Sequence, residues 1–268
     1  MKTILVCKMD GLSNSIKNLL SSFRIAKINK LNNHKVNILD HRLYNIFNNL
    51  EKINSITQFH IIQSKSSWYY TSNDISIEYP KDFLETNDKY NTVINKFGNI
   101  TYEQLYHHTP KQFINEYKMI INNLIINPKI TNYVNNFKKQ YFNEKKILGI
   151  HIRTWNGNKW KICKQSEGRY NNYYNYNSYI TVIKKYIKEG YMPFICSDDS
   201  DLLYKLKKEY DIIIHDHLDN NIEYTKEQRD FIDILLLGFC DIFVGSFLSS
   251  FSELVYYFSN DIQKTIII

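Results

Sequence analysis

The sequence predicts an α/β protein whose sheets are mostly parallel. In the second half, short continuous apolar runs alternate with longer segments of helical period, which is typical of a parallel sheet covered on both faces. The first half begins in the same way, with an apolar run followed by a helical pattern. We therefore predict two α/β units, one over residues 1–143 and the other over residues 144–268.

The first unit is expected to open with a strand over Thr3–Lys8. Apolar residues then recur at helical spacing over residues 15–30, and Val36–Asp40 forms a second apolar run. Further helices are predicted over 110–125 and 129–142, and a proline directly precedes the second of them.

The second unit is predicted to alternate regularly between strands and helices, and Gly190 ends its first helix. The strands are expected at Ile147–Arg153, Pro193–Ser197, Ile212–His215, Ile242–Gly245 and Thr265–Ile268, and the helices at Tyr179–Glu189, Ser200–Tyr210, Lys226–Cys240 and Ser249–Phe258.

Composition excludes some classes of protein. A hydrophobic content of 43% with 15% aromatic residues is too high for a disordered chain. No apolar run approaches the ~20 residues that span a bilayer, and the short apolar run near the start does not suit a secretion signal. A net charge of +7 fits an anionic ligand without requiring nucleic acid.

The cysteines are far apart in the sequence and lack the spacing of a zinc site. Reduced thiols in a reducing compartment are the simplest interpretation, and we expect a cytoplasmic protein. The cysteines are Cys7, Cys163, Cys196 and Cys240.

Ligands of open α/β sheets bind at the carboxyl ends of the strands, so unusual residues at those ends are candidate ligand-binding residues. Arg153 ends the strand that opens the second unit, and its guanidinium needs a carboxylate or a phosphate as partner. A phosphate ligand and an ordinary salt bridge to a nearby aspartate are both open. Alternation along the strand places His151 on the same face as Arg153. His151 is either a ligand-binding residue or a hydrogen-bonded core histidine.

Serines cluster where the strand ending at Gly245 meets the next helix. The N–H groups and the dipole of a helix N-terminus favour an anion. Capping of the helix is the alternative, but one serine is enough for a cap. The cluster therefore predicts a phosphate site, and its serines are Ser246, Ser249, Ser250 and Ser252.

Asp233 is a carboxylate in the otherwise apolar segment FIDILLLGFC. A buried carboxylate is costly unless N–H groups donate hydrogen bonds to it. A paired donor such as the N1 and N2 edge of guanine suits it. An internal pair with Arg229 or His151 is the alternative.

Acidic residues also follow the strand Pro193–Ser197. Asp198, Asp199 and Asp201 could hold a metal ion, but Asp and Ser at the start of a helix are more often caps. Asn14 follows Gly11 in the turn after the first strand, where a ligand could approach the backbone. Asn14 could equally cap the helix that follows.

These motifs, in this order, resemble those of the fucosyltransferase superfamily, which includes α1,6-, α1,2- and protein O-fucosyltransferases. The resemblance is strongest over about residues 145–260. It is carried by Gly11-Leu12-Ser13-Asn14, by His151-Ile152-Arg153, by Ser197-Asp198-Asp199 and by Asp233 followed by Ser249-Ser250-Phe251.

The resemblance implies a GT-B-like fold, with two facing Rossmann-like domains and a nucleotide sugar, GDP-fucose, held mainly by the second. It implies inverting transfer to a glycan or protein acceptor, without a metal or other cofactor. Arg153 would be catalytic, clamping the β-phosphate of the donor. The resemblance implies that Ser249, Ser250 and the Phe251 backbone bind the phosphates of the donor. Asp233 would bind the guanine edge, and His151 would lie near the base or ribose. Gly11 and Asn14 would contact the donor from the first domain.

The sequence departs from the family pattern near Arg153. Asn156 stands where an acid is usual, and the acids nearest to a general-base position are Glu167 and Asp10. Other functions therefore stay open. They are the same fold with another nucleotide sugar, a non-catalytic member that binds a glycan or partner, and a single-stranded nucleic-acid-binding protein suggested by the Tyr-rich stretch at 170–179.

Overall fold

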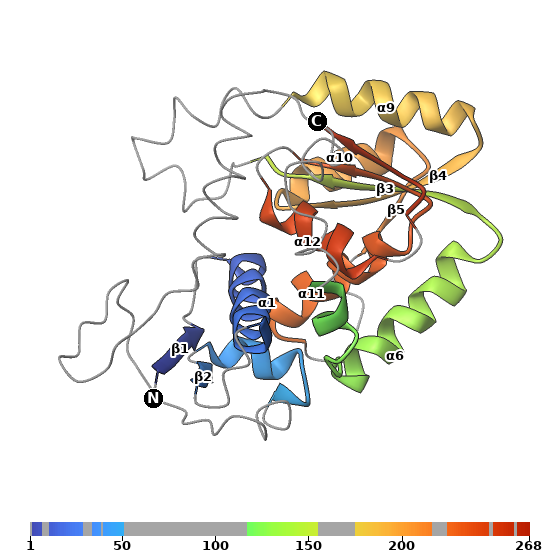
Figure 1. Cartoon of the computed structure of the whole chain (residues 1–268). Helices are drawn as coiled ribbons and strands as arrows, with labels where there is room; N and C mark the ends of the chain where they lie inside the picture. The colour runs from blue at the N-terminus through green and yellow to red at the C-terminus, as the bar shows by residue number, and fades with distance from the viewer. Residues whose placement is uncertain are drawn as a thin grey trace.

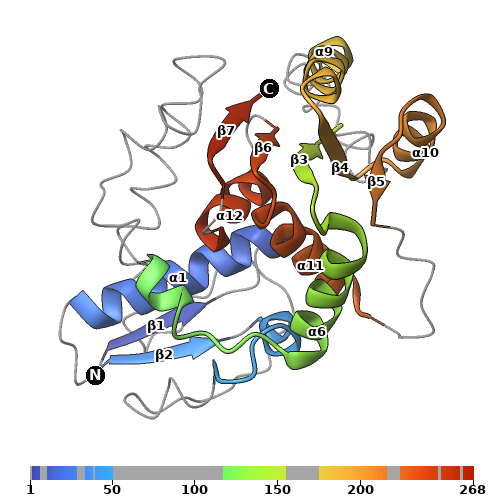
Figure 2. The same ribbon diagram turned by 90° about the vertical axis from the view of Figure 1, so that its right-hand side faces the viewer.

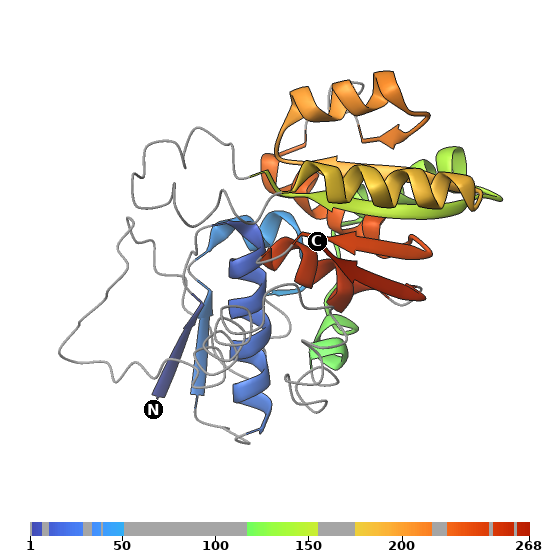
Figure 3. The same cartoon turned by 90° about the horizontal axis from the view of Figure 1, so that it is seen from above.

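The computed structural model describes residues 2–6, 11–28, 34–38, 40–50, 117–154, 175–215, 224–246, 249–259 and 262–268. In its first part, β1 (Lys2–Val6) and β2 (His34–Ile38) pair in parallel and α1 (Leu12–Ile28) connects them. Figure 3 shows α1 running beside this two-stranded sheet. The short 3-10 helix η1 (His41–Asn45) follows β2.

The second part forms a parallel five-stranded sheet with helices between its strands (Figure 1). It is preceded by α6 (Pro128–Phe137) and the π-helix η3 (Lys138–Phe142). The strands are β3 (Lys146–Ile152), β4 (Tyr191–Ser197), β5 (Ile213–Ile214), β6 (Ile242–Gly245) and β7 (Lys264–Ile267), and the helices are α9 (Tyr176–Lys188), α10 (Ser200–Glu209), α11 (Lys226–Gly238) and α12 (Ser250–Phe258).

The order of the strands across this sheet is β5-β4-β3-β6-β7. The chain moves outward in one direction from β3 through β4 to β5, and then starts again beside β3 with β6. This is the doubly wound order, and its reversal lies between β3 and β6. A ligand crevice is therefore expected at the carboxyl ends of β3 and β6, where the connections leave on opposite faces of the sheet.

Each face of the five-stranded sheet has its own cover (Figure 2). Leu148, Ile150 and Ile152 point toward α9 and α10, where they join Tyr179 and Ile183 in one apolar cluster. On the other face, Gly149 lies against α11 so closely that a Cβ there would come within 2.6 Å of the Cys240 Sγ. The predicted alternation along this strand is confirmed.

The two sheets share one apolar core. Its members come from α1, η1, α11 and α12 as well as from the second sheet. The Phe47 ring, just after η1, lies 5.4 Å from the Phe231 ring of α11 and 6.4 Å from the Phe258 ring of α12. The Gln228 side chain also donates to the Asn45 carbonyl at 3.0 Å.

The predicted boundary at residues 143/144 remains a prediction. The α6 helix precedes it, yet Phe137 packs edge-on against Phe194 of β4, with 5.8 Å between the ring centroids. Residues before 144 therefore pack against the second sheet as well as forming the first part of the chain.

The predicted α/β class with parallel sheets is confirmed, and most predicted elements match to within a few residues. The helix predicted over 129–142 is confirmed, with the α-helix ending at Phe137 and continuing as a π-helix to Phe142. Of the helix predicted over 110–125, the structure describes 117–125, where residues 117–121 are helical. Within the described ranges, no helix is both long and apolar enough to cross a membrane.

Candidate functional site

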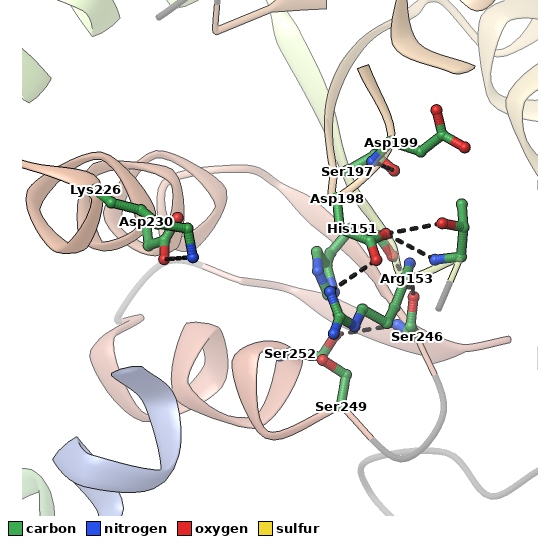
Figure 4. Close-up of polar contacts among 11 residues, drawn as sticks. His151, Arg153, Ser197, Asp198, Asp199, Lys226, Asp230, Ser246, Ser249 and Ser252 are labelled. Carbon is green, nitrogen blue, oxygen red and sulfur yellow. Dashed lines mark hydrogen bonds and ion pairs between the residues drawn. The ribbon is translucent and has the colours of Figure 1, made fainter. Parts of the chain in front are cut away.

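The carboxyl ends of β3 and β6 are tied together by a serine hydroxyl (Figure 4). Ser246 follows β6, and its Oγ donates to the His151 carbonyl at 2.7 Å and accepts from the Arg153 N–H at 2.7 Å. The buried Tyr179 hydroxyl of α9 lies 2.8 Å from the same Oγ. Ser246 thus fixes the backbone at the point where the strand order reverses.

The first turn of α12 is tied to the same place. The Ser252 Oγ accepts from the Ser246 N–H at 3.0 Å and lies 2.8 Å from His151 Nδ1. The Phe251 ring stacks on the His151 imidazole, with 4.4 Å between the centroids. The residues predicted to line a phosphate site from β3 and from the helix tip are therefore brought together.

The serine cluster holds the structure together to a greater extent than the sequence indicated. Ser249 caps α12, accepting from the Ser252 N–H at 3.4 Å, while Ser246 and Ser252 tie strand to helix. The N–H groups of Ser250 and Phe251 lie in the first turn, where an α-helix supplies no carbonyl partner of its own. These N–H groups, together with the helix dipole, are the part of the cluster best suited to an anion.

The Arg153 guanidinium forms an ion pair within the protein. Its Nη1 donates to Asp198 Oδ2 at 2.7 Å, and the two side chains are 27% and 16% exposed. Asp198 Oδ1 accepts from the Thr154 N–H at 2.8 Å and lies 3.1 Å from the Thr154 hydroxyl. The salt bridge that the sequence left open as an alternative is therefore present, and a donor phosphate would have to share the guanidinium with Asp198 or displace it.

The acids that follow Asp198 lie at the start of α10, as the capping alternative predicted. Asp199 is the N-cap of α10 and accepts from the Leu202 N–H at 3.1 Å, and Asp201 lies in the first turn. In the part of the chain that the structure describes, no group of three or more His, Cys, Asp or Glu side chains could hold a metal ion.

Asp233 pairs with a residue that the sequence analysis did not select. His215 Nδ1 lies 2.5 Å from Asp233 Oδ1, so Asp233 has an internal partner, as the alternative to a ligand required, and His215 was not among the partners predicted for it. The pKa of the nearby Cys196 thiol is raised, first by burial and then by the charge of Asp233. His215 stands at the end of a short apolar strand, the same signal that selected His151.

His151 is deeply buried at the carboxyl end of β3, with 5% of its surface exposed. Its pKa is lowered to about 3, chiefly by burial and then by the positive charge of Arg153, while Asp233 acts in the opposite direction. The imidazole is therefore neutral at neutral pH. The contacts to Ser252 and Phe251 match the core-histidine alternative, and a role near the base or ribose remains a prediction.

We expect the stability of the protein to fall as the pH falls from 6.5 toward 3 because of His151. In that window the unfolded chain binds a proton on His151, whose ordinary pKa is 6.5, and the folded chain does not. The expected loss is roughly 2 kcal/mol of unfolding free energy between pH 7 and pH 5. Urea unfolding of the wild type and of His151→Asn at both pH values measures it, and equal pH dependence in the two proteins would contradict it.

The early turns of α1 lie beside the first turn of α12. Lys17 of α1 and Glu253 of α12 form an ion pair of 2.6 Å within the early turns of both helices. Gly11 has φ +81°, a conformation that favours glycine. Because α1 begins at Leu12, Asn14 lies inside the first turn, and its alternative role as the N-cap is wrong. Contact of Gly11 or Asn14 with a donor remains a prediction.

Several residues named from the sequence lie outside the described residues. They are Asp10, Asn156 and Glu167, together with Cys7 and Cys163. The described cysteines, Cys196 and Cys240, are buried free thiols.

A scan against protein-family models gives no match, and neither does a comparison with curated proteins. Solved structures do match. The fucosyltransferase NodZ from Bradyrhizobium superposes with a TM-score of 0.60 at 15% identity, covering 96% of this chain and 92% of that one. NodZ α-1,6-fucosyltransferase co-crystallized with GDP gives 0.58 at 13% identity, with the same coverage. POFUT1 in complex with GDP-fucose gives 0.54 at 13%, covering 99% and 97%. The chain therefore has a GT-B-like fold similar to that of these fucosyltransferase structures.

Proposed function

We propose that the protein is a glycosyltransferase that transfers a sugar from a nucleotide sugar, with GDP-fucose as the donor, to a glycan or protein acceptor. The observation that carries the proposal is the reversal of strand order between β3 and β6. Arg153 and the first turn of α12 meet there, joined by Ser246 and Ser252. The structures of similar fold include complexes with GDP and with GDP-fucose.

The proposed reaction is a single displacement with inversion and without a metal. The acceptor hydroxyl forms the new bond to the anomeric carbon as the bond from that carbon to the β-phosphate oxygen breaks. The hydroxyl proton leaves to a base, and GDP departs with its bonding electron pair. Negative charge therefore develops on the phosphate, where the Arg153 guanidinium and the α12 N-terminus would stabilise it.

Guanine is the proposed base because of Asp233. A carboxylate only accepts hydrogen bonds, and the N1–H and N2–H groups of guanine offer two donors side by side. Uracil lacks that pair. Asp233 lies beside Cys196 of β4 and beside His215, which follows β5, at the edge of the sheet where the donor is proposed to bind.

Calorimetric titration with GDP, UDP and GDP-fucose tests the proposal. We expect GDP to bind at least about tenfold more tightly than UDP, since guanine brings two further N–H donors to the carboxylate and uracil lacks that pair. Asp233→Asn should reduce this preference while UDP binding changes little. Tighter binding of UDP, or no binding of either nucleotide, would contradict the choice of donor.

A second candidate is a non-catalytic protein of the same fold that binds a glycan or a partner. The Arg153–Asp198 ion pair favours it, because an internal carboxylate already satisfies part of the guanidinium. Release of GDP from GDP-fucose in the presence of a broad acceptor panel separates the two candidates. Turnover that depends on Arg153 supports the enzyme, and its absence supports the binding protein.

A further inference from the structure

The carboxylate of Asp233 is held from a neighbouring loop by His215. The two residues come from different elements, since Asp233 lies within α11 and His215 follows β5. Nδ1 and Oδ1 are 2.5 Å apart, and the side chains are only 4% and 13% exposed. When the Asp233 carboxylate is ionised it can only accept, and Nδ1 of His215 is then the donor.

The imidazole of His215 is itself fixed by aromatic packing. The Tyr133 and Phe137 rings of α6 lie 5.2 Å and 5.7 Å from it. Helix α6 thus fixes the histidine, and the histidine limits rotation of the carboxylate.

Orientation matters for a carboxylate that reads a base edge. Bidentate pairing requires the plane of the carboxylate to match the plane of the paired N–H groups. A group held in that orientation in advance gains discrimination, because the wrong partner cannot be accommodated by rotation. Of the donors proposed to bind Asp233, the 2-amino group is the one that distinguishes guanine from hypoxanthine.

We propose that His215 is a positioning residue that fixes the orientation of the Asp233 carboxylate and thereby sets the preference for guanine over purines without a 2-amino group. The inference rests on the proposed function, because it assumes that Asp233 faces the base of a bound nucleotide. His215 would then be a specificity determinant that lies outside the motifs named in the sequence.

The test compares GDP with inosine diphosphate, which differs only by lacking the 2-amino group. Calorimetry on the full chain should show the wild type binding GDP about tenfold or more tighter than inosine diphosphate. His215→Leu, which cannot donate, should bring the ratio of the two affinities close to one. The affinity for inosine diphosphate should change much less than the affinity for GDP.

A matched pair of variants controls for folding. In His215→Asn the side-chain amide lies where Nδ1 lies, and in His215→Gln it lies where Nε2 lies. We expect Asn to keep the preference for GDP and Gln to lose it. This pair decides the question even if His215→Leu shows no cooperative thermal transition.

Some outcomes would overturn the inference alone. They are equal affinity of the wild type for the two nucleotides, a preference that survives in His215→Leu and His215→Gln, and an equal loss of affinity for both nucleotides, as expected of a purely structural histidine. Failure of the wild type to bind GDP at all would instead overturn the proposed function, and this inference with it.

Discussion

Arg153→Ala is expected to slow sugar transfer by about 100-fold or more. In the proposed mechanism the guanidinium stabilises charge that develops on the leaving phosphate, and removal of one such group typically costs about 3 kcal/mol of transition-state stabilisation. The loss should fall mainly on kcat, since this charge is greatest in the transition state. The rate of GDP release from GDP-fucose, with a panel of acceptors, measures it.

Arg153→Lys is the matched control for Arg153→Ala. Lysine keeps the positive charge but loses the planar fork that pairs with a phosphate, so we expect an intermediate rate. A rate in Arg153→Ala equal to that of the wild type would show that the guanidinium serves only its ion pair with Asp198.

A variant of Asp198 tests the role of the Arg153 guanidinium independently. Asp198→Asn keeps an oxygen that can accept from Thr154 but removes the charge that faces Arg153. If the carboxylate competes with the donor diphosphate, this variant will bind GDP more tightly than the wild type. If it orients the guanidinium toward the donor, the variant will bind GDP more weakly.

The sequence was sufficient to predict the alternating strands and helices of the second sheet. Its strands are short apolar runs bounded by turns and caps, and these signals are local. Asp199 caps α10 and Ser249 caps α12, and both acts follow from residue type and position alone. The sequence also predicted that His151, Arg153 and the serine cluster are neighbours, and they are. The prediction was possible because the carboxyl ends of parallel strands meet at one edge of a sheet.

The side-chain partners could not be predicted in the same way. Arg153 and Asp198 are joined by the pairing of β3 with β4, and Asp233 meets His215 only after α11 packs on the sheet. Such partners depend on tertiary structure, and residue spacing does not determine them. The roles of Ser246 and Ser252 in tying strand to helix were unpredictable for the same reason.

Lys17→Met is expected to destabilise the protein by about 3–5 kcal/mol. Lys17 Nζ donates to Glu253 Oε2 at 2.6 Å, with the side chains 7% and 5% exposed, and the Tyr257 hydroxyl donates to the other oxygen at 2.8 Å. Methionine keeps much of the volume of lysine but leaves the buried carboxylate without its cation. Thermal unfolding should show a fall in Tm of roughly 10 °C.

Two further variants show whether this cost comes from an uncompensated buried charge. Lys17→Met combined with Glu253→Gln removes both charges and should recover most of the lost stability, since the deletion of one partner is the costly step. Lys226→Met removes the cation of an exposed pair with Asp230, 3.5 Å apart with side chains 78% and 37% exposed, and should cost only about 0.5 kcal/mol. Lys17 comes from α1 and Glu253 from α12. A large loss of stability in Lys17→Met and its recovery in the double variant would show that this ion pair links the two helices beside the proposed donor site. If Lys17→Met and Lys226→Met instead have equal, small effects, the contact between α1 and α12 is held by its apolar side chains and not by the ion pair.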